Sequence, residues 1–76
     1  MGRLRVISSR EMVRLLERLG FVVARQRGAH KRLIHPDGRR TTVPEHGGDL
    51  PRGTIRAILT DVGLSVQEYD DLAARL

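Results

Sequence analysis

The sequence lacks cysteine and tryptophan, and its only aromatic residues are Phe21 and Tyr69. Without cysteine there can be no disulfide framework, no thiolate zinc site and no cysteine nucleophile. Two aromatic residues are too few for the base-stacking surfaces of RRM and OB-type single-strand binders. No long apolar run follows the basic residues near the N-terminus, so we expect neither a signal peptide nor a membrane span, and a cytoplasmic location.

The chain is also short, at 76 residues. A chain of this size removes only about 60% of its unfolded surface from water, which leaves no room for a buried cofactor pocket. We therefore expect one domain covering residues 1–76, no cofactor, and a function carried out on the protein surface.

Acidic residues are scarce in one part of the chain. Residues 25–40 contain six cations and a single acid, Asp37, whereas the rest of the chain has eight basic and eight acidic residues. All of the formal net charge of +5 thus comes from this segment. A polyanion is the partner that such a concentration of charge favours. The six cations are Arg25, Arg27, Lys31, Arg32, Arg39 and Arg40.

The first expected element is a helix over residues 9–19. Ser8 and Glu11 have the spacing of a capping box, in which each side chain bonds the backbone amide of the other residue. Gly20 then supplies a stop signal. The apolar residues that follow the cap recur at three- and four-residue spacing and predict one buried stripe, made of Met12, Leu15, Leu16 and Leu19.

Three strands are expected next, over residues 21–25, 30–35 and 39–43. Gly28 permits the positive φ that a tight hairpin turn often needs, and residues 36–38 have the Pro-Asp-Gly pattern of a turn. Pro44 has no amide hydrogen to donate to a neighbouring strand, so it should end the third strand. Two linked hairpins predict a three-stranded antiparallel sheet.

Two helices should complete the chain. The first begins at Pro51 and ends at Gly63, which matches a helix C-terminal glycine cap. Ser65 and Glu68 form a second capping box that opens a short last helix. The predicted fold is therefore α+β, in the order α-β-β-β-α plus a short C-terminal helix, with the helices on one face of the sheet.

Alternation along the second strand decides which residues remain exposed. If Leu33 faces the helices, His30 and Arg32 lie on the open face of the sheet, near Arg25 and Arg27. A neutral imidazole there could take a proton from a ribose 2′-hydroxyl while guanidinium groups hold the phosphate, with no metal required. From these residues alone, an ordinary surface or phosphate-contacting histidine is the favoured interpretation.

Four short segments of the chain form a recognisable combination: Gly28-Ala29-His30, residues 35–44 with His46, residues 53–59, and residues 63–65. This combination closely resembles the HicA toxin family over nearly the whole chain. The resemblance implies a fold like the double-stranded-RNA-binding domain, cleavage of mRNA and neutralisation by a HicB antitoxin. The family's catalytic histidine lies in a Gly-Ser-His motif that maps onto His30, with Ala29 in place of the serine.

The sequence gives less support to a functional role for the other candidate residues. His35 is interpreted as closing the turn before Pro36. His46 could offer a second proton-transfer group, and Thr54 could contact phosphate at the start of a helix, although a structural role is at least as compatible with each. No pair of residues has the spacing of a metal site, so none is predicted. A helix-turn-helix DNA reader over the last two helices is disfavoured because the second of them is acidic.

These observations predict a metal-independent endoribonuclease toxin with His30 as general acid or base. RNA contacts are expected from Arg25, Arg27, Gly28, Lys31, Arg32, Arg39 and Arg40. The expected partners are mRNA and a HicB-like antitoxin, with no membrane contact; the free toxin should be monomeric and form a hetero-oligomer with its antitoxin. The alternative is a non-catalytic double-stranded-RNA-binding module that uses the same basic face.

Overall fold

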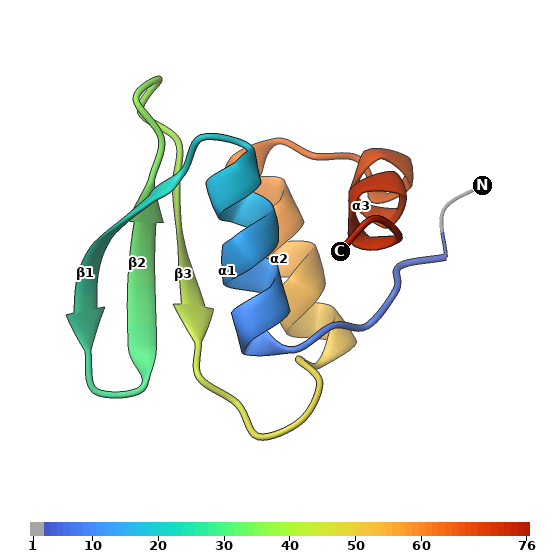
Figure 1. The fold of residues 1–76 in the computed structure, drawn as a ribbon, viewed down its shortest axis with the longest axis horizontal. Helices are drawn as coiled ribbons and strands as arrows, with labels where there is room; N and C mark the ends of the chain where they lie inside the picture. Colours follow the sequence, from blue (N-terminus) through green and yellow to red (C-terminus); the bar gives the residue numbers. More distant parts are fainter. Residues whose placement is uncertain (1–2) are drawn as a thin grey trace.

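The computed structural model describes residues 3–76, and its element order confirms the predicted α+β fold. The elements are α1 (Ser9–Arg18), β1 (Val22–Arg27), β2 (His30–Ile34), β3 (Arg40–Pro44), α2 (Arg52–Val62) and α3 (Val66–Ala73). The strands form one antiparallel sheet in the order β1-β2-β3. Both α1 and α2 contact β3, and α3 lies farthest from the sheet (Figure 1).

Local signals in the sequence set the ends of the helices. The Ser8 hydroxyl accepts from the Glu11 amide at 3.1 Å, and the Glu11 carboxylate accepts from the Ser8 amide at 3.0 Å, as predicted. The same capping box opens α3 at Ser65. Helix α1 ends one residue earlier than expected, with Leu19 as its C-cap. Pro51, expected in the first turn of α2, is instead its N-cap.

The strands are shifted by one or two residues from their predicted bounds because of the turns that join them. Arg27 pairs with His30, so β1 continues to a two-residue turn at Gly28 and Ala29. Gly28 has φ +55°, and a positive φ at the first turn residue alone is the pattern of a type II′ turn, which suits a two-residue hairpin. Pro44 is the last residue of β3 rather than the first beyond it.

His35 closes the other turn, as predicted. Its Nε2 lies 3.1 Å from the Leu19 carbonyl oxygen, and its Nδ1 accepts from the Asp37 amide at 3.1 Å. The ring also meets Phe21 edge-on, with centroids 5.1 Å apart. His35 therefore ties the turn between β2 and β3 to the end of α1 and has a structural role.

The core lies between the helices and one face of the sheet. Leu33 and Val43 are the inward residues of β2 and β3, with exposed fractions of 0% and 1%. They belong to a buried cluster with residues of α1 and α2, including Met12, Leu16 and Ile55. This confirms the inward orientation of Leu33, and it leaves the opposite face of the sheet free of helices.

The segment before α1 packs against α3, a contact that the sequence did not predict. The Asp70 carboxylate accepts hydrogen bonds from the backbone amides of Arg3, Leu4 and Arg5, and the Tyr69 hydroxyl donates to the Arg5 carbonyl. Leu4 is buried and has φ +58°, a left-handed conformation that costs a leucine about 1–2 kcal/mol. Three amides converging on one carboxylate hold the segment in this conformation.

A membrane span was not expected from the sequence. Across residues 3–76, none of the helices has both the length and the apolar character that crossing a membrane demands.

Candidate functional site

A β-bulge in β1 decides which side chains share the open face of the sheet. Val23 pairs with Leu33 and Arg25 pairs with Arg32, so Ala24 is an extra residue with no separate partner on β2. Strict alternation would put Val23 and Arg25 on the same face. Because the bulge interrupts the alternation, Val23 packs against the core while Arg25 turns outward beside Arg32.

The open face is built from three cross-strand rows, which the strand pairing defines. The rows are Arg27, His30 and Pro44; Arg25, Arg32 and Thr42; and Val22, Ile34 and Arg40. The three strands contain no aspartate or glutamate. The first two rows are therefore positively charged, and no acid of the same strands offsets that charge.

His30 lies in a shallow hollow of about 180 Å³, here called the His30 hollow. Arg25, Arg27, Arg32 and Thr42 line it together with the histidine, and all five residues are exposed. Such a site combines one imidazole, three guanidinium groups and one hydroxyl. It can hold a phosphate and exchange a proton with a neighbouring hydroxyl group. Thr42 was missed in the sequence, although its place opposite Arg32 follows once the register of β3 is known.

The turn that precedes His30 is held by its backbone. The Ala29 carbonyl accepts from the Glu45 amide at 2.5 Å, which joins the β1–β2 turn to the segment after β3. The Ala29 side chain is exposed, and Gly28 takes the positive φ. An alanine at this position therefore leaves no buried polar group unpaired and keeps the contact that fixes the turn.

Three of the expected cations lie outside the His30 hollow: Lys31, Arg39, and Arg40, which belongs to the third row of the open face. Lys31 faces the helices and lines a small hollow with Arg10 and Glu45. Arg39 lies beyond the opposite end of β2, where its Nε is 2.8 Å from the Asp37 carboxylate and its Nη1 donates to the Val62 carbonyl at 2.6 Å. Backbone and side-chain N–H groups of Arg39 hold the pKa of Asp37 below its ordinary value, although desolvation opposes them. Arg39 is therefore held by contacts within the fold, and Lys31 lies on the other face of the sheet from His30.

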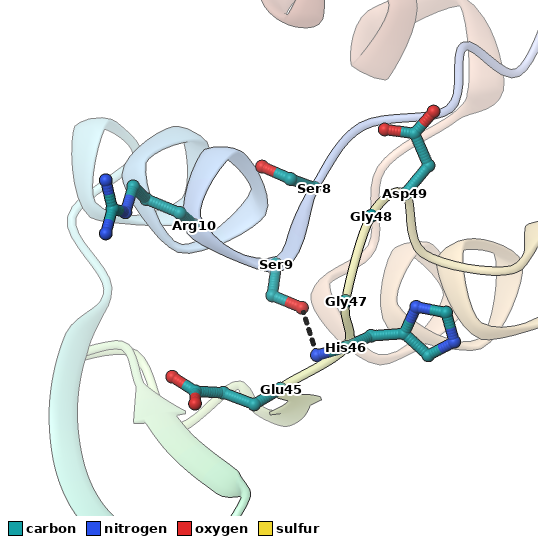
Figure 2. Close-up of a pocket in the computed structure, with 8 residues that line it drawn as sticks. All are labelled: Ser8, Ser9, Arg10, Glu45, His46, Gly47, Gly48 and Asp49. Atoms are coloured by element: carbon teal, nitrogen blue, oxygen red, sulfur yellow. Dashed lines mark hydrogen bonds between the residues drawn. The ribbon is translucent and has the colours of Figure 1, made fainter.

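His46 lines a different and larger hollow, of about 610 Å³. Its amide donates to the Ser9 hydroxyl at 3.0 Å, and that hydroxyl donates to the Pro44 carbonyl at 2.7 Å. Figure 2 shows the Glu45 and His46 side chains pointing in opposite directions from this anchored loop. The lining includes Arg10 against two acids, Glu45 and Asp49, so this hollow suits a polyanion less well than the smaller His30 hollow.

Thr54 lies in the first turn of α2 and is half-buried. Helix α2 begins at the end of the molecule where the β1–β2 turn lies (Figure 1). Thr54 does not line either hollow. Over residues 3–76, no group of three or more histidine, aspartate or glutamate side chains is arranged to hold a metal ion.

Comparison with known proteins identifies the family to which this fold and site belong. The family model described as the HicA toxin of bacterial toxin-antitoxin systems matches residues 9–64, from the start of α1 to just past the end of α2. The matched range includes the whole sheet and every residue of the His30 hollow. A comparison with curated proteins found no match. Because the family model covers well over half of the 76 residues, the chain belongs to the HicA family, the toxins of bacterial toxin-antitoxin pairs.

Proposed function

We propose that this toxin is an endoribonuclease that cleaves mRNA in the cytoplasm, with His30 as general acid or base and no need for a metal ion. The observation that carries the proposal is the bulge at Ala24, since it brings Arg25 and Arg27 to the face that holds His30 and Arg32. Charge and proton-transfer chemistry then lie in one exposed hollow. A single-stranded RNA can reach that hollow without any opening of the fold.

In the proposed reaction, the neutral imidazole of His30 takes the proton of a ribose 2′-hydroxyl. The 2′-oxygen attacks the adjacent phosphorus and the bond to the 5′-oxygen breaks, which leaves a 2′,3′-cyclic phosphate on one product. The 5′-oxygen leaves as a hydroxyl group by taking a proton from water, and the imidazolium of His30 returns its proton to solvent. Negative charge grows on the phosphate oxygens along this path, and the guanidinium groups of Arg25, Arg27 and Arg32 stabilise it. Thr42 offers a hydroxyl that can donate to the same phosphate.

This chemistry is tested with two RNAs that differ at one atom. The wild-type protein should cut a single-stranded mRNA in the presence of EDTA, and a 2′-deoxy nucleotide at the cleavage site should abolish the cut while leaving binding within about threefold, because one hydroxyl contributes little to affinity. Product mapping and a binding titration measure the two effects. Cleavage that continues at the 2′-deoxy position would contradict the mechanism.

The second candidate is a module that binds double-stranded RNA without cutting it. In its favour, the other side chains that line the hollow are three arginines and one threonine, so His30 has no second histidine or carboxyl group beside it to supply a proton to the leaving oxygen. The same EDTA experiment separates the two functions. Tight binding with no product from any RNA would favour the module.

The arginines of the open face should differ sharply from Arg39 in their effect on RNA. Arg25→Ala, Arg27→Ala and Arg32→Ala should each weaken RNA binding about tenfold, since each removes one charged hydrogen-bonding partner of a phosphate. Each should also reduce the slope of log affinity against log salt by about 0.7. Titrations at several salt concentrations measure both quantities.

Arg39→Ala is the matched control, because it removes the same charge from the other end of the sheet. Its RNA affinity and salt slope should stay near those of the wild type, while its stability falls through loss of the contacts to Asp37 and Val62. An equal loss of RNA affinity in all four variants would show that the cations act only through net charge.

The antitoxin of this pair should be of the HicB type and should inhibit by covering His30. The open face carries uncompensated positive charge, so an inhibitor with acidic groups on its contact surface would compete directly with RNA. We expect the free toxin to be a monomer and to form a hetero-oligomer with the antitoxin. A complex in which the His30 hollow remains open to solvent would argue against this mode of inhibition.

A further inference from the structure

The third row of the open face differs chemically from the other two. Val22 and Ile34 are a cross-strand pair, and their exposed fractions of 61% and 37% make them two of the three large apolar side chains that residues 3–76 leave exposed. Arg40 is the partner of Ile34 on β3 and is also exposed. The row thus pairs an apolar surface with a guanidinium group, next to the row that holds Arg25 and Arg32.

We propose that Val22, Ile34 and Arg40 form a subsite for an unpaired nucleobase of the RNA whose phosphate lies in the His30 hollow. This inference rests on the proposed function, and it assigns the choice of cleavage site to the third row. Unpaired bases are bound in proteins by stacking on apolar side chains and on the planes of arginine guanidinium groups. Both kinds of group are present in this row.

The spacing of the rows fits a nucleotide next to the reacting phosphate. Successive outward residues of a strand are about 6.6 Å apart, so the third row lies one such step beyond Arg32 and two beyond His30. One step is comparable to the length of one nucleotide in an extended single strand. A phosphate held by the first two rows, which contain His30 and Arg32, therefore brings a neighbouring base over Val22 and Ile34.

A protein partner fits the row less well as its occupant. Two exposed apolar side chains supply only a small part of the roughly 800 Å² that each member of a stable protein complex buries. They are continuous with a surface of arginines and have no acid beside them in the strands. A single base of an RNA strand matches the small size of the apolar pair, and the phosphates of that strand match the positive charge around it.

The test uses the double variant Val22→Thr/Ile34→Thr, which keeps a β-branched residue at both exposed strand positions. Val6→Thr is the matched control, because Val6 is 39% exposed and lies outside the sheet. The binding RNA is single-stranded and carries a 2′-deoxy nucleotide at the cleavage site, so that it is not cut. The double variant should bind it about tenfold more weakly, because the base loses the aliphatic surface on which it packs. It should also cut a mixed-sequence RNA with a flatter distribution of cleavage sites, while Val6→Thr behaves like the wild type.

A second RNA shows whether the lost contact is to a base. Two further RNAs each lack one base, on the 5′ or the 3′ side of the blocked position. One of the two missing bases should weaken binding to the wild type by about tenfold. The same missing base should weaken binding to the double variant by less than about twofold, because that variant has already lost the contact. Equal abasic effects in the two proteins would overturn the subsite. So would a double variant that binds antitoxin weakly but RNA normally. Since the blocked RNA is never cut, this binding result holds even if the protein proves not to be a nuclease.

Discussion

His30→Ala is expected to lower the rate of RNA cleavage by about 10²- to 10⁴-fold, the usual contribution of one general acid or base. RNA binding should change by less than about threefold, because three arginines remain in the hollow to hold the phosphate. The side chain is exposed, so its removal leaves no cavity and should not affect folding. Single-turnover cleavage in EDTA, with a parallel binding titration, measures both effects.

His46→Ala is the control for this experiment. His46 is also exposed, but it lines the larger hollow beside Ser9, so cleavage should stay within about twofold of the wild type. His35→Ala would be a poor control, because it removes the contacts that tie the β2–β3 turn to Leu19 and Phe21. If His30→Ala cleaves as fast as the wild type, the catalytic role is wrong; if only His46→Ala is inactive, the reacting phosphate binds at the larger hollow.

The sequence was sufficient wherever the structural signal is local. Each capping box involves residues three apart, and Gly63 takes its left-handed conformation directly after α2, so the ends of the helices could be predicted to within about a turn. Alternation put Leu33 and Ile34 on opposite faces of β2, and the choice of Leu33 as the inward residue is confirmed by its exposed fraction of 0%, against 37% for Ile34. These signals need no knowledge of the rest of the chain.

The bulge at Ala24 could not be predicted in the same way. Its position depends on which residues of β2 pair with β1, and pairing is set by the core and by the Gly28 turn together. Counting cations along the sequence therefore gave a single basic segment, whereas in the folded protein the cations of that segment lie on different surfaces. Three arginines enter the His30 hollow, Arg40 joins the apolar row, and Lys31 and Arg39 face other parts of the protein.

The contact between the N-terminal segment and α3 joins residues more than 60 positions apart. No local pattern around Leu4 indicates its positive φ, and Asp70 looks like any acid on an exposed helix face. Long-range polar contacts of this kind appear only when the packing of the whole chain is known.

Asp70→Asn should reduce the free energy of unfolding by about 3 kcal/mol, or roughly 15 °C in Tm for a domain of this size. The carboxylate accepts from three backbone amides, and the Asn side chain would turn an NH₂ group toward some of these donors. At least one of the three amides would then lose its acceptor while Leu4 stays in its strained conformation. Asp71→Asn is the matched control, since Asp71 is exposed and bonds only Gln67 at 3.1 Å; its Tm should change by less than about 2 °C.

The stabilising effect of Asp70 should also depend on pH, in a direction that its pKa decides. Desolvation raises the pKa of Asp70, but the amides of Arg5, Arg3 and Leu4 outweigh it and hold the pKa below its ordinary 3.8. A lowered pKa means that the carboxylate stabilises the fold fully above the unfolded value and that this contribution is lost as pH falls through the folded value. The stability difference between wild type and Asp70→Asn should thus be complete above about pH 5 and shrink below about pH 4. Urea denaturation from pH 3 to pH 7 measures it, and a difference that stayed constant over this range would mean that the charge of Asp70 does not hold the N-terminal segment.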